Sequence, residues 1–299
     1  MLLKWVLLKC LQVLIYFLYY RLLLHAKYAS EAYPGCRIIL QSPDTDVLIL
    51  SVAHFSCLNP SEFWFKTGIK DRLRYVPVHE LSQKLGVKLC RALLSYHAIT
   101  GCDSTSALDK VGKKKHWPAF EKNEEHQERL GLLGTEANLS DVVVSGCESF
   151  VCDLYPFHRR KVHTTDELRY LLFCQKKSKN ECLPPTSDSL LQHLKRANYQ
   201  VLVWRKALTA IQALPEPAGH GWAMEEGCLK PVYMTKDPAP ASLLELTTCG
   251  CKSGCETNCS CNNTGLSCSE SCYCMGSNIC RNPHGIAVDY SSDEDSDDE

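Results

Sequence analysis

The chain has 299 residues, of which 45% are hydrophobic, 22% charged and 9% aromatic, and this is enough to bury the core of one large domain or two modest ones. This composition excludes a mainly disordered chain, a collagen-like chain and a membrane protein with several spans. The formal net charge is −1, but the segment from Asp289 to Glu299 holds seven acidic residues and no basic one. Without those seven negative charges the preceding 288 residues carry a net charge of +6, so a mildly basic body precedes an acidic tail.

The first twenty residues are apolar but interrupted by charges. The longest uncharged run, Cys10 to Tyr20, has eleven residues, whereas a membrane-spanning helix needs about 20. Residues 1–24 are therefore open to four interpretations: a membrane anchor with Lys9 and Arg21 at the interfaces, a signal peptide, a buried helix, or a misplaced start of the chain. The cysteine-rich C-terminal segment described below predicts a thiolate metal site, which needs reduced cysteines and so weighs against secretion. A membrane is not the expected partner, although the apolar segment leaves it open. We expect a nuclear or cytoplasmic protein, with membrane association through residues 1–24 as the alternative.

Residues 21–180 alternate between helix and strand signals, a pattern typical of an α/β layer. The pattern predicts one helix over residues 22–32 and strands over residues 36–41, 63–66 and 74–78. An apolar segment over residues 47–55 separates the first two strands, and two more helices are predicted over residues 79–85 and 87–99. We expect a parallel sheet with helices packed on it.

The rest of the chain divides into four regions. Residues 181–214 are predicted to be helical, because apolar residues such as Trp204, Leu208 and Ile211 recur there at helical spacing. Residues 215–245 are rich in proline and predict a linker with little regular structure. A cysteine cluster lies within residues 246–284, and residues 285–299 predict a disordered acidic tail.

Nine of the nineteen cysteines fall within 32 residues near the C-terminus. They are Cys249, Cys251, Cys255, Cys259, Cys261, Cys268, Cys272, Cys274 and Cys280. This segment has almost no apolar side chain besides Leu266 and Ile279, so covalent bonds or metal ions must hold it together. A disulfide knot is disfavoured because nine cysteines cannot pair completely. Zinc takes four tetrahedral ligands, and nine thiolates supply three zinc ions if three of them each bridge two ions. The segment therefore predicts a trinuclear zinc cluster.

The cluster alternates CxC pairs with single cysteines and ends in Cys280, Arg281 and Asn282. In this it resembles the tesmin-type CXC domain. The resemblance implies three bound zinc ions and, in the family's well-known members, DNA binding. The candidate DNA contacts in this segment are Lys252, Tyr273 and Arg281.

The charge of the cluster argues against DNA binding and for an alternative role. Three zinc ions and nine thiolates sum to a net charge of −3, and Lys252 and Arg281 only cancel Glu256 and Glu270. DNA affinity depends mostly on phosphate neutralisation by lysine and arginine. The family's DNA-binding members also place a tyrosine before the fourth cysteine, where this chain has Asn258. A protein-interaction module is therefore the alternative to a DNA-binding one.

Acidic and basic residues in the body suggest a different chemistry. Asp44 and Asp46 follow the predicted strand over residues 36–41, and the carboxyl ends of parallel strands are where α/β sheets bind ligands. With Asp103, these carboxylates are candidates for a Mg²⁺ or Mn²⁺ site that cleaves phosphodiesters. The segment after Asp103 holds a glycine and three candidate phosphate-binding lysines, Lys113, Lys114 and Lys115. A helix cap at Asp44 and a solvated lysine face are the simpler interpretations.

Two segments, SPDTDVLIL at residues 42–50 and HAITGCDSTSALDKVGKKK at residues 97–115, resemble the PIN-like and flap-endonuclease fold. The resemblance implies acids at strand ends and a Gly-Lys-rich helix-turn-helix that grips DNA. Together with residues 183–208 and the cysteine cluster, these segments look like a group of transposable-element-derived animal proteins. The first acid of this chain is Glu31, although the family needs acids on an earlier strand and helix. We therefore expect a truncated PIN-like region.

The sequence thus predicts a zinc-binding CXC-domain protein of transposon origin on an inactive nuclease-like body. Its partners would be DNA or other proteins. The alternative is a Mg²⁺- or Mn²⁺-dependent, structure-selective DNA nuclease that a longer isoform or a partner completes.

Overall fold

The computed structural model describes residues 21–108, 111–157, 160–175, 183–237, 248–252, 254–269, 272–276 and 280–284. The chain forms two compact units, Met1–Thr235 and Lys236–Glu299. The expectations for residues 1–20 and for the acidic tail over residues 285–299 fall outside the described residues. Among the described residues, no helix combines the length and the apolar composition that crossing a bilayer requires.

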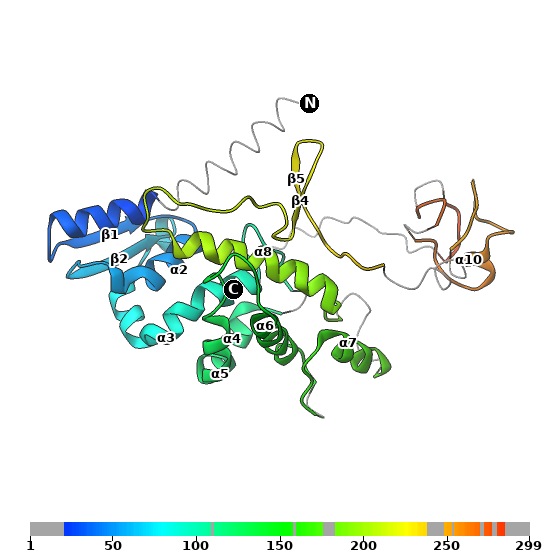
Figure 1. Cartoon of the computed structure of the whole chain (residues 1–299), viewed down its shortest axis with the longest axis horizontal. Coiled ribbons are helices and arrows are strands. Elements are labelled where there is room, and N and C mark those ends of the chain that lie inside the picture. The colour runs from blue at the N-terminus through cyan, green and yellow to red at the C-terminus, as the bar shows by residue number, and fades with distance from the viewer. Residues whose placement is uncertain are drawn as a thin grey trace. The chain divides into compact units, whose positions relative to one another are not determined.

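The first unit contains a three-stranded mixed sheet (Figure 1). Its strands lie in the order β1 (Arg37–Gln41), β2 (Glu62–Thr67) and β3 (Arg74–Pro77). β1 and β2 are parallel, whereas β2 and β3 are antiparallel. The three strands were expected, but the expectation of a wholly parallel sheet is wrong for β3. A parallel pair needs a crossover of a dozen residues or more, and the short connection over residues 68–73 is too short to provide one.

Helices supply the rest of the first unit. Residues 21–32 are helical, and the later helices are α2 (Thr45–His54), α3 (Val78–Ile99), α4 (Lys113–Lys122), α5 (Glu124–Leu130), α6 (Asp141–Asp153), α7 (Thr165–Cys174) and α8 (Ser187–Arg205). Two 3₁₀ turns, η1 (Phe55–Cys57) and η2 (Lys70–Arg72), lie before and after β2. α3 packs against α2, α5, α8 and β2, so it is central to the core. Among the largest fully buried side chains are Trp204, Phe63, Phe65, Phe120 and Phe150.

The helix α3 is broken at Gly86, where φ is 73° and ψ is 167°. This backbone conformation is one that glycine adopts without the steric cost that a Cβ brings. The prediction of two helices, over residues 79–85 and 87–99, is therefore confirmed.

The helix α8 ends earlier than the sequence pattern predicts. Lys206 and Ala207 already make turn hydrogen bonds to Val203 and Trp204, and Ile211 is 89% exposed. Leu208 still packs on the core, so the apolar periodicity continues past the end of the helix.

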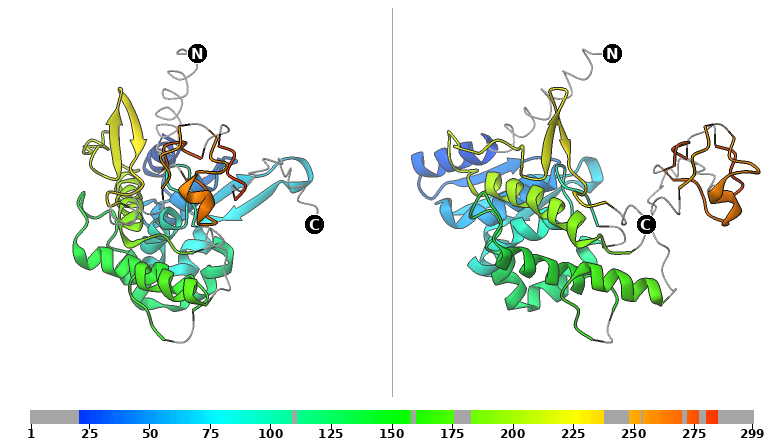
Figure 2. Two further views of the ribbon diagram at one scale, coloured as in Figure 1. Left: turned by 90° about the vertical axis from the view of Figure 1, so that its right-hand side faces the viewer. Right: turned by 45° about the vertical axis from the view of Figure 1, so that its right-hand side comes forward.

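Part of the expected linker is an ordered hairpin of β4 (Trp222–Glu225) and β5 (Cys228–Pro231), which projects from the helical body (Figure 2). Glu226 and Gly227 both have positive φ, as a two-residue type I′ turn requires. The buried Arg196 of α8 donates hydrogen bonds to the carbonyl groups of Gly221 and Val232. The expectation of little regular structure is wrong here. Hydrogen bonds from α8, which precedes the hairpin in the sequence, hold it in place, and the local proline pattern does not reveal them.

The part of the second unit that the structure describes is poor in regular structure, as expected for the cysteine cluster. Its described residues form the short helix α10 (Ser260–Asn263) and otherwise turns and bends. The buried hydrophobic side chains among these described residues all belong to cysteines.

Candidate metal centre

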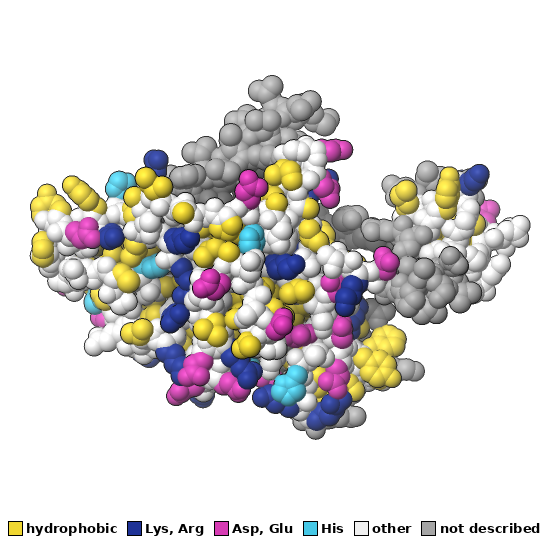
Figure 3. Space-filling model, in the orientation of Figure 1, with side chains coloured by type: hydrophobic (Ala, Val, Ile, Leu, Met, Phe, Trp, Pro, Cys, Tyr) yellow, Lys and Arg dark blue, Asp and Glu magenta, His cyan; other side chains and the backbone are white. Residues whose placement is uncertain are grey.

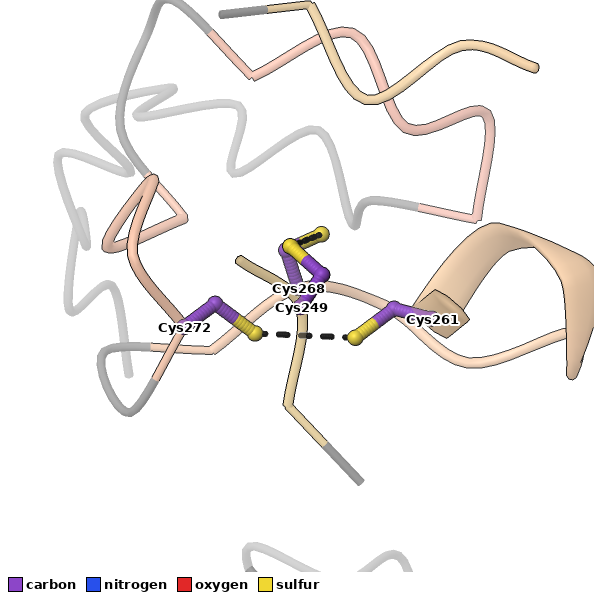
Figure 4. A group of neighbouring side chains, drawn as sticks. All are labelled: Cys249, Cys261, Cys268 and Cys272. Atoms are coloured by element: carbon purple, nitrogen blue, oxygen red, sulfur yellow. Dashed lines mark hydrogen bonds between the residues drawn. The ribbon is translucent and has the colours of Figure 1, made fainter. Parts of the chain in front are cut away.

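The cysteines of the second unit gather their sulfur atoms into overlapping groups of four, called here the first, second and third quartets. In each quartet all sulfur atoms lie within 4.8 Å of one another. The first quartet is Cys249, Cys261, Cys268 and Cys272, the second is Cys249, Cys251, Cys255 and Cys259, and the third is Cys249, Cys255, Cys268 and Cys274. Figure 4 shows the side chains of the first quartet pointing toward one another from separate segments of the second unit. Across the three quartets, Cys249, Cys255 and Cys268 each belong to more than one.

The spacing of the sulfur atoms fits tetrahedral zinc. Sulfur atoms at the corners of a tetrahedron with Zn–S bonds of about 2.3 Å are about 3.8 Å apart. The distance from Cys249 Sγ to Cys268 Sγ is 3.8 Å, and that from Cys249 Sγ to Cys255 Sγ is 3.9 Å. Cys261 Sγ and Cys272 Sγ are 3.5 Å apart. A disulfide bond is only about 2.05 Å long, and all nine cysteines of this unit are free.

Backbone hydrogen bonds join the first part of the cysteine-rich segment, around Cys249 and Gly254, to its last part, around Tyr273 and Cys280. The amide of Tyr273 donates to the carbonyl of Cys249, at 3.0 Å. Gly254 forms a β-bridge with Cys280, and Cys255 follows with φ of 70°. These contacts align cysteines that are distant in sequence.

Asn282 supports the cluster from outside the set of sulfur ligands. Its side chain is 6% exposed, and its Nδ2 donates to the carbonyl of Leu266 at 2.8 Å and to Cys268 Sγ at 3.2 Å. Hydrogen bonds from such outer groups orient metal ligands and tune the metal site. The Cys-x-Asn ending was the available sequence signal, but it did not reveal the contact to Cys268.

The sulfur atoms differ in how easily they ionise. Burial raises the pKa of the Cys249 thiol to about 12 and that of Cys261 to about 11. Burial also opposes ionisation of Cys259, but hydrogen bonds from the backbone amide of Asn262 and from neighbouring thiols lower its pKa to about 6. Hydrogen bonds from backbone amides likewise lower the pKa of Cys272 to about 7. Burial thus opposes the charged form of these thiols, hydrogen bonds offset it at Cys259 and Cys272, and a cation such as Zn²⁺ would favour the thiolate form of each ligand.

The three candidate DNA contacts of this unit lie on its surface. Tyr273 is 63% exposed, and Lys252 is also exposed. Arg281 makes an exposed ion pair with Glu256, with Nη1 and Oε1 3.3 Å apart. One of the two cations of the segment thus already faces a carboxylate.

The candidate acids of the first unit do not form a metal-ligand group in the described part of the chain. All groups of three or more close ligand atoms found there are cysteine groups of the second unit. Asp44 caps α2, accepting a hydrogen bond from the Asp46 amide at 2.7 Å. Asp46 is buried and accepts a hydrogen bond from His97, and Asp103 is exposed. The described residues show no grouping of these acids, and the remnant Mg²⁺ or Mn²⁺ site stays a prediction.

The three candidate lysines lie at the start of α4. Lys113 is half-buried and faces His97, whereas Lys114 and Lys115 are exposed. On the face of the first unit drawn in Figure 3, lysine and arginine side chains are interspersed with aspartate and glutamate.

Comparisons of the chain with protein-family models, curated proteins and solved structures find no match. The candidate metal centre therefore stands on the geometry of its own residues.

Proposed function

We propose that the second unit is a CXC-type module that binds three zinc ions and folds around them. The observation that carries this proposal is the overlap of the quartets through shared cysteines. Independent four-cysteine sites share no ligand, whereas a trinuclear cluster of nine thiolates needs three bridging ones. Cys249, Cys255 and Cys268 are the three shared cysteines.

The remaining cysteine, Cys280, completes the assignment. It interacts with Cys255, Cys268 and Cys274, all of which belong to the third quartet. Cys249 lies in all three quartets, and a bridging thiolate in this scheme serves two ions. With Cys280 in place of Cys249 in the third quartet, each ion has four ligands and each shared cysteine serves two ions.

The metal ions would provide the folding free energy of this unit. Its described buried hydrophobic residues are cysteines, which give little apolar surface without a metal. Structural zinc sites contribute about 10–16 kcal/mol in small domains. We propose a folding and interaction role for the module rather than a catalytic one, because a closed set of four protein ligands leaves no open position for a substrate.

Protein interaction is the role that the charges favour. The net negative cluster and the Arg281–Glu256 ion pair leave little positive charge for phosphate groups. Binding to a DNA duplex at low salt that weakens steeply as salt rises would favour the DNA alternative, with Lys252 and Tyr273 as its contacts.

Native mass spectrometry of the full chain tests the zinc proposal. We expect three zinc ions per chain and their loss on treatment with a strong chelator, together with increased hydrogen exchange over residues 248–284. A metal-free chain with intrachain disulfides would contradict the proposal. Retention of exchange protection after complete metal removal would contradict the folding role.

A further inference from the structure

A chain of three side chains that the metal centre does not use lies in the first unit. His97 Nε2 is 2.6 Å from Asp46 Oδ1, and His97 Nδ1 is 3.0 Å from Lys113 Nζ. Asp46 and His97 are 7% and 6% exposed. The three residues come from α2, α3 and α4, so the tertiary fold assembles them.

The two hydrogen bonds of His97 define its tautomer. The carboxylate of Asp46 can only accept, so His97 Nε2 carries the hydrogen that lies between them. In a neutral imidazole Nδ1 then has a free lone pair, which accepts from the Lys113 amine. The His97 ring is also fixed against Trp204, with ring centroids 5.8 Å apart. A nucleophile, a base and a third group that orients the base form the arrangement that activates nucleophiles in enzymes.

The surroundings of Lys113 oppose its positive charge. Burial lowers the pKa of Lys113, against the opposite effect of Cys102, Asp46 and Asp103. Lys113 is also the first residue of α4, with Gly112 as an N-cap that has no side chain. The backbone amides at a helix N-terminus disfavour a cation there.

We propose that Lys113 is the nucleophile of a Lys113–His97–Asp46 relay that adds to the carbonyl group of an anionic aldehyde or ketone. Lys114 and Lys115 are exposed beside it and supply the positive charge that attracts the anionic group. This site is independent of the zinc proposal.

The reaction balances with water as the only product besides the adduct. The Lys113 ammonium gives one proton to His97 Nδ1, and Asp46 stabilises the resulting imidazolium. The free Nζ electron pair attacks the carbonyl carbon, and a proton passes from nitrogen to oxygen to give a carbinolamine. His97 then returns its proton to the hydroxyl group, which leaves as water, and the product is a protonated imine on Lys113.

Reductive trapping tests the proposal. The full chain is incubated with glyoxylate, an anionic aldehyde, and cyanoborohydride, and peptide mass spectrometry measures the modification rate of each lysine. General-base assistance is worth about 100-fold or more, so we expect Lys113 to react at least about tenfold faster than Lys114 and Lys115. Acetaldehyde, which has no charge, should show a smaller preference for Lys113. Equal rates at all three lysines, or an equal preference with both aldehydes, would overturn the proposal.

Variants show whether a fast reaction of Lys113 depends on the relay or only on the exposure of its side chain. His97→Gln keeps an amide donor toward Asp46 but has no ring nitrogen to take the proton, so it should slow Lys113 about tenfold or more. Lys122→Met, at the other end of α4, is the matched control and should leave the Lys113 rate unchanged. An undiminished Lys113 rate in a folded His97→Gln protein would refute the relay. If circular dichroism shows that this variant is unfolded, Asp46→Asn provides the same test, with the same expected loss and the same refuting result.

Discussion

The sharing of cysteines makes a quantitative prediction about zinc stoichiometry. Cys255 belongs to two quartets, whereas Cys251 belongs only to the second. Serine is similar in shape to cysteine, but its hydroxyl stays protonated at neutral pH and is a poor zinc ligand. Cys251→Ser therefore weakens one zinc site, and Cys255→Ser weakens two.

The size of the effect follows from the number of ligands. A structural zinc site is worth about 10–16 kcal/mol, so one of four similar thiolates contributes about 2.5–4 kcal/mol. Its loss weakens a site by about a hundredfold or more. Against a zinc chelator of intermediate affinity, we expect the native chain to keep three ions, Cys251→Ser two and Cys255→Ser one.

Zinc retained after chelator competition is counted by native mass spectrometry and checked with a chromogenic indicator. Cys228→Ser, in β5 of the first unit, is the matched control and should keep all three ions. Equal losses from Cys251→Ser and Cys255→Ser would refute the bridging assignment.

Three further predictions concern single side chains. Asn282→Ala removes the hydrogen bond to Cys268 Sγ and should weaken zinc binding about 10–100-fold in the same chelator competition; an unchanged affinity would contradict the role of Asn282. Arg196→Met removes two hydrogen bonds from a buried guanidinium and should lower the free energy of unfolding of the first unit by about 2–4 kcal/mol in urea titrations, whereas a loss below about 1 kcal/mol would contradict the anchoring of the hairpin. Burial lowers the pKa of both His54 and His193 below the usual 6.5, so the unfolded chain binds more protons than the folded one below about pH 6.5. The first unit should therefore lose stability as pH falls, by up to about 1.4 kcal/mol per pH unit for each histidine, and His54→Gln should reduce that slope in denaturation measured from pH 7.5 to 5.

The candidate metal centre was the most predictable part of the molecule because its cysteines are local in sequence. Nine cysteines within 32 residues predict the ligand type without any knowledge of the tertiary fold. The contact from Asn282 to Cys268 was missed, because it depends on how the chain turns after Cys280. The grouping of the cysteines into quartets likewise depends on the tertiary fold, because it combines cysteines up to 25 positions apart.

In the first unit, local pattern predicted elements but not their partners. The strands and the break at Gly86 follow from local sequence signals, whereas the antiparallel pairing of β3 follows from connection length. The position of Asp46 after a strand suggested a metal ligand, yet the residue that contacts it, His97, lies 51 positions away. Spacing along the sequence does not contain that information.

The two units illustrate different ways of holding a chain together. In the first unit, apolar side chains such as Trp204 and Phe63 are fully buried, and the removal of apolar surface from water stabilises the fold. Among the described residues of the second unit, the buried hydrophobic side chains are those of cysteines, and several of their thiols have raised pKa values because burial disfavours the charged form. Zinc binding converts such thiols to thiolates and releases protons. In the proposed trinuclear arrangement every ion would share bridging sulfurs with its neighbours, so removing one ion would leave an uncompensated negative charge beside the others. Loss of one ion is therefore expected to weaken the binding of the other two, and the partial retention of zinc expected for Cys251→Ser and Cys255→Ser measures how far.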